Sequence, residues 1–277
     1  MKPEWLNKKI DLKVLSSMKG RLRKLGVRTV CEEALCPNAG ECFGRGVVTF
    51  LILGRNCTRA CSFCNVNKSA PLPPDKDEPR RVAEAVSKFG LKHVVVTSVT
   101  RDDLPDGGAK AFADTVLSIR KKSPRTTIEV LVPDFKLSLK AIETVIRSGP
   151  DIFAHNVETV PSLYKKVRQG SDYSRSLEVL RIAKETAPKI KAKSGIMLGM
   201  GETEEEVLQV MRDLRSAGCD FLSIGQYLAP SLGHYPVKEH VRPEKFSDYK
   251  EKGMELGLLH IESGPYVRSS YMAGMYL

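Results

Sequence analysis

Short apolar runs alternate with amphipathic segments six times between about residues 47 and 257. In the first amphipathic segment, Val82, Ala85, Val86 and Phe89 share one helical face. Such alternation favours a parallel sheet with right-handed crossovers. Six units are fewer than the eight of a closed barrel, so we expect an α/β fold, a partial (β/α)6 TIM-type barrel that stays open. The expected strands are 47–53, 93–99, 127–132, 151–155, 191–198 and 221–225.

The chain divides into three parts around this pattern. Residues 1–46 form an N-terminal extension rich in cysteine, residues 47–257 form the partial barrel, and residues 258–277 form a C-terminal segment. No internal repeat and no low-complexity segment interrupts them. We therefore expect one large domain with an appendage at each end.

Polar and glycine-rich residues follow the expected strands where their carboxyl ends should meet. In parallel barrels, reactive groups collect at that rim. The residues concerned are Cys57 after the first strand, 97–103 after the second, 156–159 after the fourth, 199–202 after the fifth and 226–227 after the sixth.

The seven cysteines are unevenly placed, because six of them lie between residues 31 and 64, in two groups of three. The first twenty residues are charged throughout and no apolar run reaches membrane-spanning length, so a cytoplasmic location is expected, without a membrane. Thiols stay reduced there, which favours metal chemistry over disulfides. A structural zinc site needs four ligands, so each group of three leaves one position open.

The second group, Cys57, Cys61 and Cys64, has the spacing Cys-x3-Cys-x2-Cys. In a loop, three such thiolates can bind three corners of an iron–sulfur cube. This spacing after a first barrel strand resembles the radical S-adenosylmethionine (SAM) superfamily, in which SAM chelates the open iron and is cleaved to methionine and a 5′-deoxyadenosyl radical. A zinc site with one ligand from elsewhere is the alternative.

Other residues on the rim suit SAM by their chemistry. Glycine lets backbone approach an adenine closely, and a carboxylate accepts hydrogen bonds from a ribose diol. We therefore expect the methionyl end near Thr97 and Ser98, the ribose near Asn156 and Glu158, and the adenine near Gly199 and Gly201.

The first group, Cys31, Cys36 and Cys42, precedes the barrel and predicts a second cluster. Cys219 is a poor fourth ligand, because it follows Gly218 at the start of a strand, where a buried thiol is usual. A ligand other than cysteine, or the substrate, must therefore complete this site.

Five motifs together resemble the lipoyl synthase family, and the likeness runs from about residue 28 to 273. They cover residues 30–38, 40–42, 101–108, 155–159 and 264–271. In that family the Arg-Ser-Ser-Tyr motif, here residues 268–271, supplies a serine oxygen to the auxiliary cluster. The resemblance assigns this role to Ser270, with Ser269 as the alternative. An oxygen ligand binds iron less strongly than a thiolate, which suits a cluster that comes apart.

The resemblance also implies the reaction and its cofactors, two [4Fe-4S] clusters and SAM. The substrate is an octanoyl chain amide-linked to a lysine of a lipoyl carrier domain, such as the glycine cleavage H protein or a 2-oxoacid dehydrogenase E2. Two SAM molecules give radicals that remove hydrogen from C6 and then C8, and sulfur comes from the auxiliary cluster. Cys57, Cys61, Cys64 and Ser270 are thus the expected catalytic residues, and a flavodoxin or ferredoxin is the expected reductant.

The formal net charge of +11 is mainly that of a solvated, lysine-rich surface, and it gives nucleic-acid binding weak support, because no run of five basic residues occurs and aromatic residues make up 6%. The carrier domains that the resemblance implies tend to be acidic, so this charge would also steer their docking. Two alternatives remain open. One is another radical SAM sulfur-inserting enzyme, similar to biotin synthase or an RNA methylthiotransferase. The other is a non-catalytic zinc-binding protein associated with nucleic acid, which only the charge supports.

Overall fold

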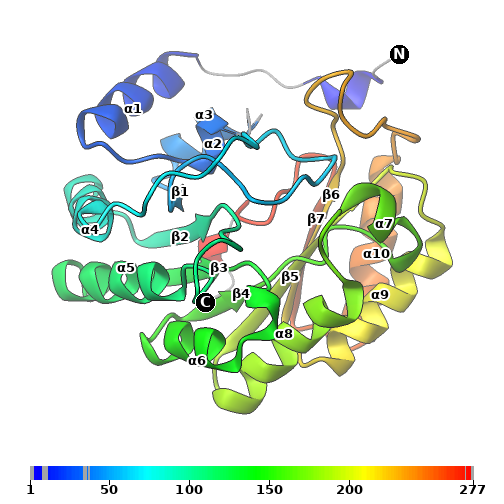
Figure 1. Cartoon of the computed structure of the whole chain (residues 1–277). Coiled ribbons are helices and arrows are strands. Elements are labelled where there is room, and N and C mark those ends of the chain that lie inside the picture. The colour runs from blue at the N-terminus through cyan, green and yellow to red at the C-terminus, as the bar shows by residue number, and fades with distance from the viewer. Residues whose placement is uncertain (1–2, 8–11, 34–35, 37, 272, 276–277) are drawn as a thin grey trace.

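The computed structural model describes residues 3–7, 12–33, 36, 38–271 and 273–275 (Figure 1). Seven parallel strands form one sheet in sequential order, and its two ends, β1 and β7, are not paired with each other in this order. The expected α/β partial barrel is therefore confirmed. The strands are β1 (Val48–Ile52), β2 (His93–Ser98), β3 (Thr127–Leu131), β4 (Ile152–Ala154), β5 (Lys191–Leu198), β6 (Phe221–Gln226) and β7 (His260–Gly264).

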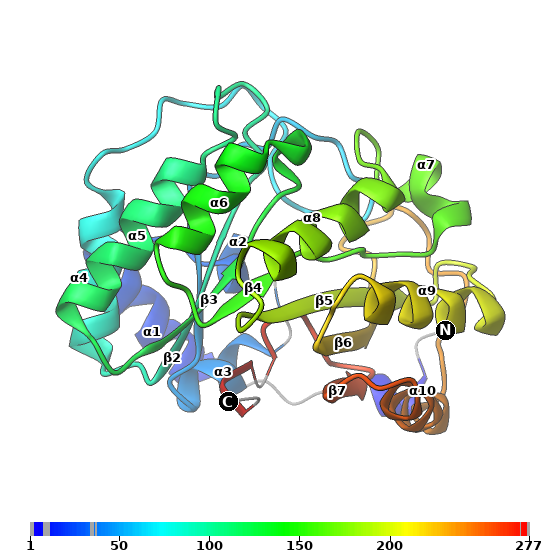
Figure 2. The same ribbon diagram turned by 90° about the horizontal axis from the view of Figure 1, so that it is seen from below.

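A helix follows each of the first six strands except that β4 is followed by two, and the long helices cover the outer face of the sheet (Figures 1 and 2). Helix α9 begins at a capping box, in which Thr203 accepts the Glu206 amide while the Glu206 carboxylate accepts the Thr203 amide. The helices are α4 (Glu78–Phe89), α5 (Ala109–Lys122), α6 (Leu139–Arg147), α7 (Tyr164–Val167), α8 (Tyr173–Thr186), α9 (Glu204–Ser216) and α10 (Pro243–Glu255).

Strand β7 lies in the C-terminal segment, for which the sequence predicted no strand. Its register pairs Gly225 of β6 with Gly264. Only Ile261 of this strand is buried, so the strand lacks the apolar run that marks β1 or β2. Short, half-polar edge strands give little periodicity, and that explains the omission.

The N-terminal extension packs against the first β/α unit. It contains α1 (Leu12–Lys24), α2 (Val30–Glu33) and α3 (Ala39–Gly44). The guanidinium carbon of Arg21 lies 4.5 Å from the ring centre of Phe89 in α4. Thr29 forms an isolated antiparallel bridge with Phe50 of β1. These contacts place the first three cysteines beside the start of the barrel.

The C-terminal segment crosses close to the sheet after β7. A Cβ atom on Gly225 would lie 2.0 Å from the carbonyl oxygen of Val267, and one on Gly195 would lie 2.8 Å from Oγ of Ser269. Further along, a Cβ on Gly274 would lie 2.9 Å from Cβ of His93 in β2. The segment therefore runs from β7 past β6 and β5 to β2 (Figure 2). At Gly225, Gly195 and Gly274 the segment and the sheet approach so closely that a Cβ atom has no room, which explains why these residues are glycine.

A buried ion pair joins two strands across β4. Nζ of Lys193 in β5 lies 3.0 Å from both carboxylate oxygens of Glu129 in β3, and the two side chains are 1% and 0% exposed. Nε2 of His93 is 3.8 Å from the same carboxylate. The charges of Lys193 and Glu129 are stable there only because they are paired with each other.

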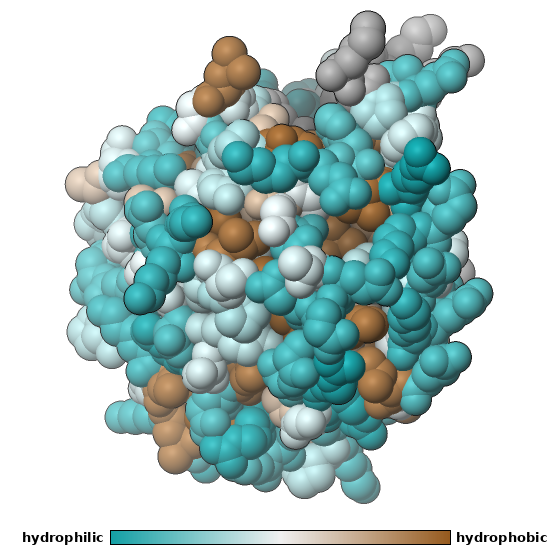
Figure 3. Space-filling view, turned by 90° about the vertical axis from the view of Figure 1, so that its right-hand side faces the viewer, coloured by the Kyte–Doolittle hydropathy of each residue, from teal (hydrophilic) through white to brown (hydrophobic). Residues whose placement is uncertain are grey.

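The surface is mainly hydrophilic on the face that Figure 3 presents, with hydrophobic residues scattered over it. Among the residues that the structure describes, no helix combines the length and the apolar character that crossing a membrane requires.

Candidate active site

The loop after β1 carries the second group of cysteines and begins with a sharp turn. Leu53 and Gly54 have φ angles of 67° and 87°, in the left-handed region. The Leu53 amide donates to the Glu78 carboxylate at 2.7 Å, and its carbonyl accepts from the Arg101 guanidinium at 3.3 Å. Further on, the Cys57 amide donates to the carbonyl of Asn67 at 2.8 Å, which closes the loop on itself. The cysteines are thus held on an anchored loop.

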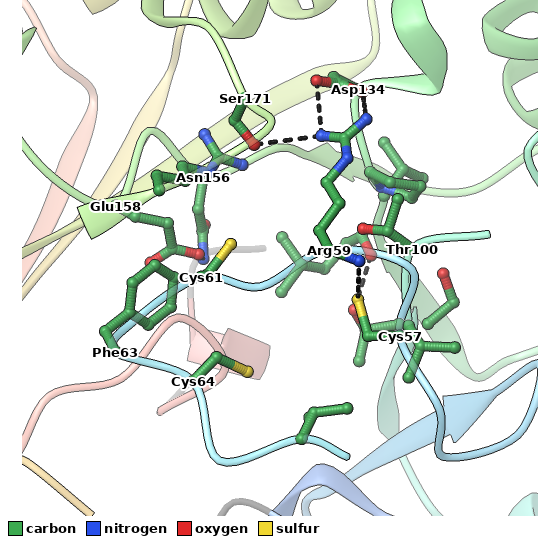
Figure 4. Close-up of a pocket in the computed structure, with 18 of the residues that line it drawn as sticks. Cys57, Arg59, Cys61, Phe63, Cys64, Thr100, Asp134, Asn156, Glu158 and Ser171 are labelled. Carbon is green, nitrogen blue, oxygen red and sulfur yellow. Dashed lines mark hydrogen bonds and ion pairs between the residues drawn. The ribbon is translucent and has the colours of Figure 1, made fainter. Parts of the chain in front are cut away.

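The three thiols of this loop face one cavity of about 170 Å³ at the carboxyl ends of the strands. In Figure 4 the sulfur atoms of Cys61 and Cys64 point to the same side, into the space that separates them from Cys57. The cavity lies at the rim where the sequence predicted the reactive residues. Its lining comprises Cys57, Arg59, Cys61, Phe63, Cys64, Val66, Lys68, 97–100, 131–134, Asn156, Glu158, Arg168 and Ser171.

Burial favours the protonated form of two of these thiols, Cys61 and Cys64. It raises the pKa of Cys61, and it raises the pKa of Cys64 to about 11. Metal binding would therefore release protons from them. Within the described part of the chain, no three side chains of His, Cys, Asp or Glu are placed to hold a single metal ion.

Four of the six residues expected to contact SAM line the cavity: Thr97, Ser98, Asn156 and Glu158. Thr97 donates its hydroxyl to the Leu131 carbonyl at 2.7 Å. The hydroxyl of Ser98 is buried and has no hydrogen-bond partner among the described residues. A buried polar atom without a partner is costly unless a ligand satisfies it.

Asn156 and Glu158 form a pair whose orientation is fixed. Nδ2 of Asn156 donates to Oε1 of Glu158 at 3.0 Å. Glu158 has φ 67°, and its amide and carbonyl bond to Gly195 and Met197, both at 2.9 Å. A non-glycine residue in the left-handed region is strained, and such strain is concentrated at functional sites. Burial raises the pKa of Glu158, although the nearby Arg168 charge opposes it.

Gly199 and Gly201, the expected adenine contacts, are not among the lining residues of this cavity. A Cβ on Gly199 would lie 2.2 Å from Nε2 of Gln226 and 2.3 Å from the carbonyl oxygen of Glu239. The Gly199 and Met200 amides donate to the Glu202 carboxylate. The absence of a side chain at Gly199 is thus explained by the segment that packs on it.

Two arginines belong to the site although no motif in the sequence marked them. Arg168 lines the cavity, and its Nη1 donates to the hydroxyls of Tyr164 and Ser176, both at 2.9 Å. Its charge lowers the pKa of Cys61, against the larger effect of burial. Arg59, between Cys57 and Cys61, bonds to Asp134 and Ser171 (Figure 4). It also bonds to Asp102. An arginine near a cysteine motif gives no sequence signal by itself.

The cysteines of the first group lie close enough to affect one another. Burial, and then the neighbouring Cys36 and Cys42, raise the pKa of Cys31 to about 12. The Cys36 amide donates to the Cys31 carbonyl at 3.2 Å. Residues 34, 35 and 37 of this motif lie outside the described residues. Cys219 is fully buried, as expected, with Sγ 3.2 Å from the carbonyl oxygen of Phe221.

The Arg-Ser-Ser-Tyr motif lies between the two groups of cysteines. Its Tyr271 hydroxyl donates to the Glu41 carboxylate at 3.0 Å, next to Cys42. Its Ser269 hydroxyl donates to Oδ1 of Asn156 at 2.7 Å, at the cavity. The motif therefore connects the first group of cysteines to the lining of the cavity.

Comparison with known proteins gives one family. The family model described as "Radical SAM superfamily" matches residues 51–214. Lipoyl synthase from Geobacter metallireducens is 57% identical over 99% of this chain and 97% of its own. Lipoyl synthase from Caldanaerobacter subterraneus subsp. tengcongensis is 56% identical over 276 residues, which are 100% of this chain and 97% of its own.

Solved structures support the fold. The crystal structure of methylornithine synthase (PylB) covers 90% of this chain and 84% of its own, with a TM-score of 0.57 and 16% identity. The maturase HydG covers 93% of this chain and 62% of its own, with a TM-score of 0.57 and 16% identity. At such identities the likeness concerns the fold alone.

Proposed function

Because the chain belongs to the lipoyl synthase family of the radical SAM superfamily, we propose that it inserts two sulfur atoms, at C6 and C8, into an octanoyl chain carried on a protein lysine. Membership of the superfamily implies a [4Fe-4S] cluster and SAM. One observation carries the proposal: the C-terminal motif bonds to Glu41 beside the first cysteines and to Asn156 in the cavity of the second. A sulfur donor and a radical source would thereby face one space.

The second group of cysteines fits the cluster that binds SAM. Cys57, Cys61 and Cys64 line one cavity, and the unpartnered hydroxyl of Ser98 offers a polar ligand atom a partner. When bound there, the cluster supplies an electron that cleaves SAM to methionine and a radical able to remove hydrogen from an unactivated carbon. Glu158 and Asn156 remain the proposed ribose contacts, because both present polar atoms at this cavity.

Arg168 is the proposed partner of the SAM carboxylate. It is 8% exposed, lines the cavity and carries a charge close enough to lower the pKa of Cys61. A buried guanidinium whose orientation is fixed by Tyr164 and Ser176 can bind a carboxylate with little loss of entropy. Contact between the adenine and the backbone of Gly199 and Gly201 stays a prediction, because these two residues lie outside the cavity lining.

Cys31, Cys36 and Cys42 are the proposed ligands of a second [4Fe-4S] cluster, whose sulfide would be the sulfur donor. The sequence assigned its serine ligand to Ser270 and left Ser269 open. The direction of the Ser269 side chain supports Ser269 better, because its oxygen points to Asn156 and hence to the cavity where the radical forms. A donor cluster must face that cavity for its sulfur to reach a carbon radical.

The remaining lining suits an alkyl chain. Phe63, Val99, Leu131 and Val132 give the cavity apolar walls, which bind a methylene chain without offering it a base. An unactivated methylene has no acidic proton, so the residues here need only to hold the chain and exclude water. The carrier would be an acidic lipoyl domain, of an H protein or an E2, drawn by the net charge of +11. A flavodoxin or ferredoxin would be the reductant.

Neither alternative from the sequence is as well supported. Biotin synthase or an RNA methylthiotransferase would not account for relatives named lipoyl synthase at 57% identity along nearly the whole chain. A non-catalytic zinc protein would not account for membership of the radical SAM superfamily.

Three alanine variants test the division of labour between the two groups of cysteines. Cys57→Ala should abolish SAM cleavage, and Cys31→Ala should leave cleavage but stop sulfur insertion. Cys219→Ala is the matched control, because this buried thiol belongs to neither group. SAM cleavage is measured as 5′-deoxyadenosine and insertion by mass spectrometry. Equal loss of cleavage in the first two variants would contradict the proposal.

The serine ligand is tested by iron content. The wild-type chain, reconstituted without oxygen, should hold on the order of eight irons if both clusters are cubes. Ser269→Ala should lower the iron content more than Ser270→Ala does. The reverse order would restore the assignment to Ser270, and four irons in a fully reconstituted wild-type chain would refute the second cluster.

A further inference from the structure

The Arg59 guanidinium is fully hydrogen-bonded by three other loops of the barrel rim. Nε and Nη2 donate to the Asp102 carboxylate at 2.8 and 3.0 Å. Nη1 and Nη2 donate to the Asp134 carboxylate at 2.9 and 2.6 Å. Nη1 also donates to Oγ of Ser171 at 3.1 Å. A guanidinium has five N–H groups, and these bonds employ all five.

These partners come from three segments that are separate in the sequence. Asp102 follows β2, Asp134 follows β3, and Ser171 follows α7. The Arg59 side chain is 6% exposed and that of Asp134 is fully buried. Further cations lie near the carboxylates: Nη1 of Arg175 is 3.6 Å from Asp134, and Nζ of Lys136 is 3.9 Å from Asp102. The guanidinium therefore ties the cysteine loop to three neighbouring segments at a desolvated point.

The segment that Asp134 begins is itself strained. Phe135, Lys136 and Leu137 have φ angles of 46°, 50° and 60°, all in the left-handed region. Such a conformation is unfavourable for a residue that is not glycine. Asp134 helps to hold it by accepting the Lys136 amide at 3.1 Å. Strain kept in place beside a cavity indicates that the position of this segment matters there.

The backbone of Arg59 faces a cysteine of the cavity. Its amide donates to Sγ of Cys57 at 3.5 Å (Figure 4). The neighbouring Thr58 is also fixed, because its amide and hydroxyl both donate to the Thr100 carbonyl at 3.0 Å. The direction of the Arg59 amide thus depends on a backbone held from both sides.

We propose that Arg59 is a positioning residue for the SAM-binding cluster. The five hydrogen bonds of the Arg59 side chain hold the Arg59 amide toward the Cys57 sulfur, and this amide helps to set the reduction potential of the cluster. This inference rests on the proposed function of Cys57, Cys61 and Cys64. Hydrogen bonds to ligand sulfurs are among the factors that set the potentials of iron–sulfur clusters. A donor near sulfur stabilises the more negative, reduced form, so a misdirected amide makes the cluster harder to reduce.

The test compares Arg59→Lys with Arg120→Lys in the reconstituted full chain. Lysine keeps the charge but cannot make five bonds in a fixed fork. Arg120 is the matched control, because it also ties several segments together, bonding Thr126 and Gly149 carbonyls and Asp151 before β3 and β4, away from the cysteines. Iron content and the midpoint potential of the SAM-responsive paramagnetic signal are measured in each.

Arg59→Lys should keep its iron and show a lower midpoint potential, with SAM cleavage about tenfold slower at a fixed reductant potential, equivalent to about 59 mV for one electron. Arg120→Lys should match wild type in potential. Ser171→Ala removes one neutral partner of Arg59 and should lower the midpoint potential by less. If Arg59→Lys holds no iron, the midpoint potential of Ser171→Ala is the test of the inference.

If Arg59→Lys holds iron and its midpoint potential is unchanged, the inference about Arg59 is overturned. If Arg59→Lys holds no iron, an unchanged midpoint potential in Ser171→Ala overturns it. Neither result would affect the proposed function. A wild-type chain without any SAM-responsive iron signal would instead overturn the proposed function. The two failures are therefore distinguishable.

Discussion

Replacing Gly225 by Ala should displace the C-terminal motif from the sheet. The new Cβ would lie 2.0 Å from the Val267 carbonyl oxygen, whereas ordinary contact begins at 3.4 Å, so that oxygen must retreat by about 1.4 Å (3.4 minus 2.0). Overpacking of this kind costs about 1–3 kcal/mol, and a backbone neighbour favours the upper end. A shift of about 1 Å in positioned groups can cost about a hundredfold in rate.

The control is Gly264→Ala, in the residue of β7 that pairs with Gly225. Its Cβ would lie 3.5 Å from Cγ2 of Val267, which is ordinary contact. The assays are hydrogen exchange of amides 267–271 and the rate of sulfur insertion. Gly225→Ala should exchange faster and insert sulfur about a hundredfold more slowly, while SAM cleavage without substrate falls less. If the two variants agree in both assays, the motif is not held by β6 as described.

The buried charges near β3 give two further predictions. Lys193→Met should lower the free energy of unfolding by about 3–5 kcal/mol, because the fully buried Glu129 loses its partner, and a loss below about 1 kcal/mol in urea titration would contradict this. Burial, and then the Lys193 charge, lower the pKa of His93 from 6.5 to about 4, so the unfolded chain binds the proton more tightly and stability falls as pH drops from 6.5 toward 4. This difference of about 2.5 pKa units is worth about 3 kcal/mol. In His93→Gln the urea midpoint should therefore change less between pH 7 and pH 4.5 than it does in the wild-type chain. If the midpoint changes equally with pH in both, His93 is not the source of this pH dependence.

The strands and their rim were predictable because local patterns encode them. Short apolar runs, 50–53 and 94–96, mark β1 and β2, and both strands are almost wholly buried. The cysteine spacing is equally local, and the expected positions of Thr97 and Glu158 at one cavity follow from strand order alone. Such features require no knowledge of contacts between distant residues.

The features that the sequence could not predict depend on distant contacts. Nothing in the local sequence around Arg59 indicates its role, because its partner Asp134 is 75 positions away in the chain. Ser269 meets Asn156 across 113 positions, and Gly225 requires glycine only because the tail returns to β6. Strand β7 was omitted since its one buried residue, Ile261, leaves no periodic signal.

The most direct measurement supplies the chain with clusters built from heavy-isotope sulfide and incubates it, without oxygen, with SAM, reductant and an octanoyl-lysyl carrier domain. Mass spectrometry then reads the carrier. The account predicts that the octanoyl group gains two sulfur atoms in a first turnover and that both carry the heavy isotope. An unchanged octanoyl group despite SAM cleavage, or inserted sulfur without the label, would contradict it.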